Sequence, residues 1–300
     1  MKDFFTLEMT ITTFSLLNSA TSYLEKNHIE SPRLTAELLL AFACKTDRGG
    51  LFLRLRDVLP EKSLEIFRTL LHKRSSHEPL QYLLGKQEFW SSDFEVDNDV
   101  LIPRPETELL VEKTLSIINN NYNPLPHPII WDIGTGSGNI IISLAKELGE
   151  RCRYVASDIS QLALKKAENN AQRNNVADLI GFLHGDMFSP LKEEKRKVDI
   201  IVSNPPYIRS CDILTLQEEI KQHEPIIALD GGLDGLKFYK LILEEAYLFL
   251  RPRGNLLLEI GSDQAEDVLG LLLRNNNYRL VEVLRDYACK DRVVWIEMGI

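Results

Sequence analysis

The first ninety residues repeat apolar side chains at intervals of three and four positions, which is the spacing of amphipathic helices. In the second helical segment, Ser31 and Pro32 mark the start. Proline fits the first helical position because its missing N–H would be unpaired there, and we expect Ser31 to cap the helix. The pattern predicts a small all-helical domain over residues 1–85. Its three clearest helical segments are residues 11–24, 33–44 and 63–71.

From Lys86 onward the pattern changes to alternation of apolar and polar residues. Glu88 to Trp90 and Phe94 to Val96 alternate in this way and are separated by Ser91-Ser92-Asp93. This arrangement predicts a short β-hairpin, which we take as a linker over residues 86–100. The segment PRP that follows is typical of the entry to a helix, which we expect over residues 106–118.

After a segment rich in Asn and Pro, NNNYNPLPHP at residues 119–128, strand-like and helix-like runs alternate to the end of the chain. Strands that alternate with helices predict an α/β fold with a mostly parallel, doubly wound sheet. The last two strand-like runs have no helix between them, so we expect an antiparallel hairpin at the sheet edge. The expected strands are residues 129–133, 153–158, 179–186, 198–204, 255–261, 278–284 and 292–298.

A glycine-rich loop, GTGSG at residues 134–138, lies between a predicted strand and a predicted helix. Glycines there permit a tight turn and the close approach of a nucleotide. The spacing is neither that of a dinucleotide fold nor that of a P-loop. Asp158 ends the next predicted strand, where an acidic residue can accept hydrogen bonds from both hydroxyls of a ribose. Together these features favour an adenosyl ligand, and the alternative is a turn that merely requires glycine.

Two further strand ends point to the same edge of the sheet. Asp186 and Met187 follow the third strand, where the carboxylate can reach an exocyclic amine and the thioether can cover a ring; a simple strand-to-loop transition is the alternative. The fourth strand ends in NPPY at residues 204–207, where two prolines cannot continue a central strand. The Asn204 side-chain oxygen and the Pro205 carbonyl are two acceptors on a stiff backbone, suited to hold an NH₂ group. This predicts an amide or amine as the target.

Charge narrows the possible partners. The chain has 35 Lys and Arg against 44 Asp and Glu, a net charge of −9, which argues against binding nucleic acid or anionic lipid through overall charge. Residues 1–90 carry a net charge of +1 and residues 91–300 one of −10, whereas a DNA-recognising region would be basic. Lys73, Arg74 and Lys86 are interpreted as a solvated helix face rather than a partner surface.

Cysteine usage and the amino terminus bear on the location of the protein. Cys44, Cys152, Cys211 and Cys289 lie far apart without a C-x-x-C pair, so we expect reduced thiols and no metal site. The segment MKDFFTLEMT lacks a secretory cleavage pattern, and no apolar run reaches the roughly 18 residues needed to cross a bilayer. We therefore expect a cytoplasmic protein that does not contact membranes.

The order DIGTGSG, Asp158, GDMF and NPPY resembles class I S-adenosylmethionine-dependent methyltransferases. Longer segments, among them SPRLTAELLL, HEPLQYLLGKQEFW, LIPRPETELLVE and HEPIIALDGGLDGLKFY, resemble the PrmC/HemK family of peptide chain release factor protein-(glutamine-N5) methyltransferases. The resemblance implies a Rossmann-like methyltransferase domain over residues 101–300, with a mostly parallel sheet and an antiparallel edge hairpin. It also implies that the helical domain over residues 1–85 engages the substrate.

The activity implied by the resemblance is methylation of the amide nitrogen, N5, of the glutamine in the GGQ motif of release factors. The implied cofactor is S-adenosyl-L-methionine, and no direct contact with nucleic acid is expected. The residues implied to hold the target glutamine are Asn204, Pro205, Pro206 and Tyr207. Those implied to bind the cofactor are Gly134, Thr135, Gly136, Ser137, Gly138, Asp158, Asp186, Met187 and Asn204.

Other functions stay open on the residues alone. The NPPY motif is shared with adenine-N6 DNA methyltransferases and some rRNA methyltransferases, so DNA or RNA adenine remains a candidate target, as does a ribosomal-protein glutamine. A nucleotide-binding protein that docks release factors without catalysis is a third candidate.

Several residues depart from the family pattern or have open roles. Arg104 and Glu106 either line the cofactor pocket or cap a helix, and Glu224 is expected to be structural. Met187 replaces an aromatic residue of some members, and Arg253 replaces a common glycine. We expect the turn to avoid positive φ at Arg253.

Overall fold

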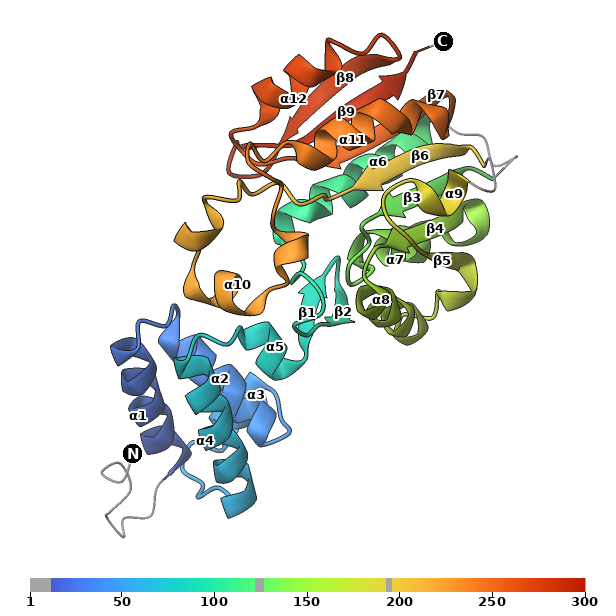
Figure 1. The fold of residues 1–300 in the computed structure, drawn as a ribbon. Helices are drawn as coiled ribbons and strands as arrows, with labels where there is room; N and C mark the ends of the chain where they lie inside the picture. Colours follow the sequence, from blue (N-terminus) through green and yellow to red (C-terminus); the bar gives the residue numbers. More distant parts are fainter. Residues whose placement is uncertain (1–11, 122–126, 193–195, 300) are drawn as a thin grey trace. The chain divides into compact units, whose positions relative to one another are not determined.

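The computed structural model describes residues 12–121, 127–192 and 196–299. Contacts between residues divide the chain into two units (Figure 1). The first unit contains the chain up to Gly85 together with the short segment Glu218–His223. The second contains Lys86–Gln217 and the chain from Glu224 onward. The amino-terminal decapeptide and part of the Asn- and Pro-rich segment lie outside the described residues.

The first unit is helical, as the three- and four-residue spacing predicts. Leu17, Leu24, Leu39, Leu40 and Phe67 are fully buried and form its core. The three predicted helical segments are confirmed, and two short helices that the periodicity did not indicate, α3 and α5, accompany them. Within the described residues, no helix of the protein is long and apolar enough to cross a membrane. The helices of this unit are α1 (Thr13–Lys26), α2 (Pro32–Ala43), α3 (Arg48–Leu53), α4 (Glu61–Ser75), α5 (Leu80–Leu84) and α10 (Glu218–His223).

Two side chains of this unit behave differently from expectation. Ser31 precedes α2 as predicted, but its φ of 47° is left-handed and its hydroxyl makes no capping hydrogen bond. Arg74 was expected on a solvated face, yet it is 5% exposed. Its guanidinium donates to the Glu78 carbonyl at 3.0 Å and pairs with Glu219 of α10 at 2.8 Å. Arg74 therefore holds α10 against α4. This contact could not be expected from the sequence, because the two helices are far apart along the chain.

The predicted hairpin consists of β1 (Lys86–Phe89) and β2 (Ser92–Glu95), paired antiparallel. Its turn is Trp90-Ser91, with φ angles of 48° and 53°, one residue earlier than the sequence pattern suggests. Phe89 and Phe94 are buried and meet edge to face, with ring centroids 6.0 Å apart. Both belong to the hydrophobic core of the second unit.

The second unit is built on a seven-stranded sheet in the order β5-β4-β3-β6-β7-β9-β8. The first five are parallel, and β9 pairs antiparallel with both β7 and β8. The predicted edge hairpin is therefore confirmed. The strands are β3 (Ile129–Ile133), β4 (Arg153–Asp158), β5 (Ile180–His184), β6 (Val198–Ser203), β7 (Leu250–Glu259), β8 (Tyr278–Arg285) and β9 (Asp291–Met298).

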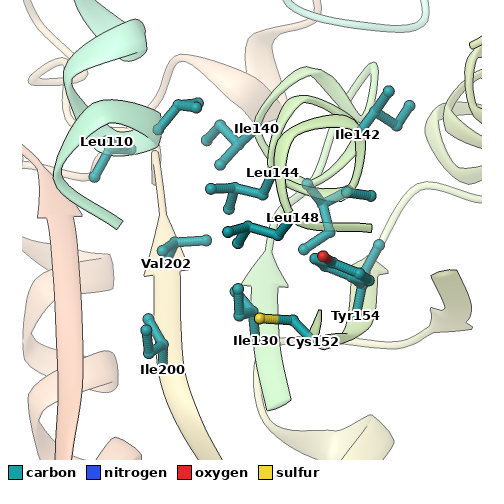
Figure 2. Packing of buried hydrophobic residues seen from close by; sticks show 14 of the residues in the cluster. Leu110, Ile130, Ile140, Ile142, Leu144, Leu148, Cys152, Tyr154, Ile200 and Val202 are labelled. Atoms are coloured by element: carbon teal, nitrogen blue, oxygen red, sulfur yellow. The ribbon is translucent and has the colours of Figure 1, made fainter. Parts of the chain in front are cut away.

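Alternate residues of the central strands point to opposite faces of the sheet, and each face has its own core. One core contains Ile130 and Ile200 with apolar residues of the helices α6, α7 and α8, and Figure 2 shows part of it. The other contains Trp131 and Ile201 with residues of α11 and α12. The covering helices are α6 (Glu108–Asn121), α7 (Asn139–Leu148), α8 (Gln161–Arg173), α9 (Ser189–Lys192), α11 (Lys237–Glu245) and α12 (Ala265–Leu272).

The strand order determines where a ligand can bind. From β3 the chain continues outward to β4 and β5, whereas β6 lies on the other side of β3 and continues to β7. Loops that leave β3 and β6 at their carboxyl ends therefore diverge and open a crevice between them. The glycine loop follows β3, and the NPPY segment follows β6.

Within β7, the turn at Arg253 differs from our expectation that Arg253 would avoid a positive φ. Its φ is 62°, so it occupies the left-handed region that the turn was expected to avoid. The pairing of β6 with β7 shifts register here, from Val198 opposite Leu250 to Ile200 opposite Asn255. Gly254 is needed for a different reason, because a Cβ there would lie 2.8 Å from the Arg251 carbonyl oxygen. Close backbone approach thus requires the glycine at 254, and the strained angle falls on Arg253.

Candidate functional site

The loop after β3 places its three glycines in the left-handed region, with φ angles of 72° at Gly134, 55° at Gly136 and 82° at Gly138. A Cβ built on Gly134 or Gly136 would meet nothing within 4 Å. A Cβ on Gly138 would lie only 2.7 Å from the Ile142 side chain, so this glycine permits close packing at the start of α7. The first two glycines therefore leave space beside the loop for a ligand, and the third serves the fold.

Asp158 at the end of β4 faces this loop. Its Oδ2 accepts a hydrogen bond from the Gly136 N–H at 2.9 Å, and its Oδ1 accepts one from the Ser160 N–H at 2.8 Å. Burial raises the pKa of Asp158, while these two hydrogen bonds act in the opposite direction. Each oxygen keeps a further lone pair, so the carboxylate can also accept from the hydroxyls of a ligand.

A second carboxylate, Asp132, lies on β3 directly before the loop and is fully buried. Its Oδ2 accepts a hydrogen bond from the Thr135 hydroxyl at 2.7 Å, and its Oδ1 has no partner among the described residues. Burial raises the pKa of Asp132 to about 7, and the charge of Asp158 adds to this effect. Two neighbouring carboxylates next to the glycine loop favour a positively charged ligand over an anionic one.

The segment after β5 contributes Asp186 and Met187 to the same crevice. Met187 has a φ of 46°, so its backbone turns sharply there. The next residue, Phe188, is buried against Trp131 of β3, with ring centroids 5.5 Å apart. This packing fixes the segment to the sheet and leaves the two preceding side chains at the crevice.

Asn204 follows β6 at the other side of the crevice. Its Nδ2 donates a hydrogen bond to the Thr107 hydroxyl at 3.2 Å. Pro205 and Pro206 also line the crevice, but Tyr207 is not among its lining residues. Burial raises the pKa of Tyr207 to about 12, and the charge of Glu259 adds to this shift. The phenol is therefore neutral near pH 7.

A backbone strap supports the NPPY segment from behind. Ile208 forms a parallel bridge with Asp230, which precedes the glycines of the segment DGGLDG. A Cβ on Gly231 would lie 2.8 Å from the Tyr207 backbone, so only glycine permits this approach. From a third element, the buried side chain of Gln264 donates to the Tyr207 carbonyl at 3.0 Å. The acceptor segment is thus held along its length by backbone contacts.

These elements enclose a cavity of about 260 Å³, close to the lower end of the roughly 300–1,000 Å³ typical of small-molecule sites. Neither Arg104 nor Glu106 lines it; Arg104 pairs with the buried Glu224 at 2.5 Å. Thr135, Ser137 and Gly138 lie outside the lining as well. The sequence-predicted residues that the structure brings together there are Gly134, Gly136, Asp158, Asp186, Met187, Asn204, Pro205 and Pro206.

Comparison with known proteins agrees with this arrangement. The family of the PrmC N-terminal domain matches residues 15–85, and a methyltransferase domain family matches residues 127–284. The chain is 43% identical to the release factor glutamine methyltransferase of Moorella thermoacetica over 92% of its own length and 95% of that protein. It is 41% identical to that of Geobacter sulfurreducens, over 86% and 87% of the two chains. The chain belongs to the release factor glutamine methyltransferase family.

Solved structures show the fold independently. The hMettl16 catalytic domain in complex with MAT2A 3'UTR hairpin 6 superposes with a TM-score of 0.55 at 16% identity, covering 77% of this chain and 81% of that one. At such identity the likeness concerns the fold alone. Membership in the release factor glutamine methyltransferase family confirms the predicted class I fold and the predicted S-adenosylmethionine-dependent methyltransferase class.

Several parts of this methyltransferase site carry no local sequence signal. The loop before the PRPETE segment contributes Asp99 to Leu101, and α11 contributes Lys237 and Phe238 to the lining. Thr107 reaches Asn204 from 97 positions away. No motif in the sequence draws attention to Thr107.

Proposed function

We propose that this protein methylates the N5 amide nitrogen of the glutamine in the GGQ motif of peptide chain release factors, with S-adenosyl-L-methionine as the methyl donor. The names and the 37–43% identity of the relatives support this substrate. The observation that carries the chemistry is that Asn204 and Pro205 line the same cavity as Gly134 and Asp158. A nucleotide-type loop and a paired amide acceptor therefore face one another.

The cavity fits the proposed cofactor. Gly134 and Gly136 leave open space where side chains would intrude, which suits the methionine end, and Asp158 offers acceptors to the ribose. Asp186 and Met187 would contact the adenine by hydrogen bonding and apolar cover. The carboxylates of Asp132 and Asp158 suit the positive charges of the sulfonium and the ammonium group. Thr135, Ser137 and Gly138 would act indirectly, by holding the loop.

When bound, the cofactor supplies an electrophilic methyl group on a sulfonium centre. The part of the protein is to orient the glutamine amide, whose lone pair is delocalised and weakly nucleophilic. Asn204 Oδ1 and the Pro205 carbonyl would each accept one amide hydrogen, which fixes the nitrogen in line and raises its electron density. The same two oxygens hold the extra proton at the nitrogen until it passes to water. Pro206 stiffens this acceptor pair, and Tyr207 would border the side chain of the target.

The domain roles belong to the same proposal. We assign residues 1–85 to engagement of the folded release factor, residues 86–100 to a hairpin linker and residues 101–300 to methyl transfer. The near-neutral charge of residues 1–90 suits a protein partner. We place the reaction in the cytoplasm, with no nucleic acid or membrane as a direct partner.

The test is mass spectrometry of an unmodified release factor incubated with the protein and S-adenosylmethionine. We expect a mass gain of one methyl group, located on the GGQ glutamine in the peptide map. Asn204→Ala should abolish the gain, whereas Asn276→Ala, at an exposed asparagine remote from the cavity, should leave it unchanged. Methylation by Asn204→Ala at the wild-type rate would overturn the role of Asn204. If the wild-type protein binds cofactor but methylates no release factor, the substrate assignment fails and ribosomal protein, DNA and RNA are tried.

A further inference from the structure

Asn204 is the first member of a hydrogen-bonded chain that ends at a buried carboxylate. Its Nδ2 lies 3.2 Å from Thr107 Oγ1, and Thr107 Oγ1 lies 2.7 Å from Glu259 Oε2. Thr107 is 2% exposed and Glu259 is 1% exposed, so water does not compete for these bonds. The three residues come from the loop after β6, the turn before α6 and the strand β7, which meet only in the folded chain.

The direction of these hydrogen bonds follows from counting hydrogens. A threonine hydroxyl has one hydrogen, and an ionised carboxylate has none. When Glu259 is ionised, Thr107 must donate to it, and the Thr107 oxygen can then only accept. The atom of Asn204 that faces Thr107 must therefore be the NH₂ nitrogen. Because the carboxamide is planar, its oxygen then lies on the opposite side.

When Glu259 is protonated, the hydrogen bonds of this chain can run in the opposite direction, from Glu259 through Thr107 to Asn204. The carboxylic acid can donate to Thr107, and the hydroxyl hydrogen is then free to be donated to an oxygen of Asn204. The carboxamide would then rotate, and its NH₂ group would replace the acceptor oxygen. The NH₂ group of Asn204 would then face the NH₂ group of the substrate amide. Both groups are hydrogen-bond donors and cannot bond to each other, so this state is unproductive.

We propose that Thr107 and Glu259 are positioning residues that orient the Asn204 carboxamide with its oxygen toward the substrate. The inference rests on the proposed function, since it assigns a task to residues behind the amide acceptor. Neither residue lines the cavity, so both act through Asn204 and not on the reacting atoms.

The groups around Glu259 keep its two protonation states close in free energy. Burial is the largest influence and raises the pKa of Glu259 to about 7, and the charge of Glu106 raises it further. The Thr107 hydrogen bond, the charge of Arg292 on β9 and a weaker hydrogen bond from the Asn204 side chain lower it. Tyr239 of α11 donates its hydroxyl to the backbone carbonyl of Glu259 at 3.0 Å, and the neutral Tyr207 lies nearby.

The first experiment compares Thr107→Val with Thr107→Ser. Valine matches threonine in shape but lacks the hydroxyl, whereas serine keeps it. We expect Thr107→Val to lose about ten- to hundredfold in kcat, with the dissociation constant for S-adenosylhomocysteine near the wild-type value. Thr107→Ser should recover most of the activity. Wild-type kcat in Thr107→Val would overturn the inference.

The second experiment does not depend on activity. The side-chain NH₂ resonances of Asn204 are observed in protein labelled with ¹⁵N-asparagine and identified by their loss in Asn204→Ala. From about pH 6 to about pH 8.5 they should shift as Glu259 ionises, and the shift should vanish in Glu259→Gln. Resonances that do not change with pH in the wild-type protein would overturn the inference. If the wild-type protein fails to methylate a release factor, the proposed function is wrong. The pH dependence of these resonances still tests whether Thr107 and Glu259 orient Asn204.

Discussion

The stability of the protein should depend on pH through Glu259. Burial raises its pKa from the ordinary value of 4.5 to about 7. In the unfolded chain the carboxyl recovers its ordinary pKa. Between these two values the folded protein therefore holds a proton that the unfolded chain has released. The contribution of Glu259 to the free energy of unfolding is thus fully present below the unfolded pKa and falls as the pH rises toward about 7. Above about pH 7 it no longer changes with pH.

The magnitude follows from the width of that window. Each pH unit inside it changes the free energy of unfolding by about 1.4 kcal/mol, so a rise from about pH 5.5 to about pH 7 removes about 2 kcal/mol. Glu259→Gln has no such proton, so relative to the wild type it should gain about 2 kcal/mol between about pH 5.5 and about pH 8. Asp132 titrates in both proteins alike and cancels in the comparison.

Urea denaturation followed by circular dichroism at the two pH values measures this difference. Thr107→Ser serves as a control that keeps the carboxyl and should follow the pH dependence of the wild type. A stability difference between Glu259→Gln and wild type that is the same at both pH values would refute the reasoning, because Glu259 would then not titrate in this window.

Three further substitutions test local features of the second unit. Gly138→Ala should lower the free energy of unfolding by about 2–3 kcal/mol, since its methyl group would meet α7 at 2.7 Å with φ at +82°; denaturation curves matching the wild type would contradict this. Arg253→Gly should raise stability by about 0.5–1 kcal/mol by relieving the left-handed angle, and thermal melts should show no such gain for Arg253→Ala. Asn170→Ala should cost about 2–3 kcal/mol, because the buried Asn170 bonds the backbone of Glu95 at 2.7 and 3.0 Å and the Ser137 carbonyl at 2.9 Å. Denaturation midpoints equal to those of wild type would show that water replaces these bonds.

Much of the fold follows from local pattern. Runs such as residues 129–133 and 198–203 are buried on both faces of a parallel sheet, so they are mostly apolar and easily recognised. Their polar members are Asp132, Asp199 and Ser203. The glycine loop and the NPPY segment were also predictable as neighbours, because both follow strands and the carboxyl ends of parallel strands share one edge. The short helices α3 and α5 were not, since five or six residues are too few to show a helical period.

The support of the site could not be predicted from the sequence. Thr107 and Glu259 are 152 positions apart, and Gln264 reaches Tyr207 across 57 positions. Such pairs depend on how strands and helices pack, and neither residue type nor spacing marks them. The angle at Arg253 could not be predicted either, because the close approach of the Arg251 carbonyl oxygen to position 254 appears only in the folded turn.

The strap behind Tyr207 has a consequence for the strength of substrate binding. A flexible acceptor loop would lose about 1–2 kcal/mol of conformational entropy for each residue that becomes ordered when substrate binds. Here the Ile208–Asp230 bridge and the Gln264 hydrogen bond order the segment when the chain folds. The entropy loss then belongs to folding, and the contacts made by the incoming side chain count in full toward affinity.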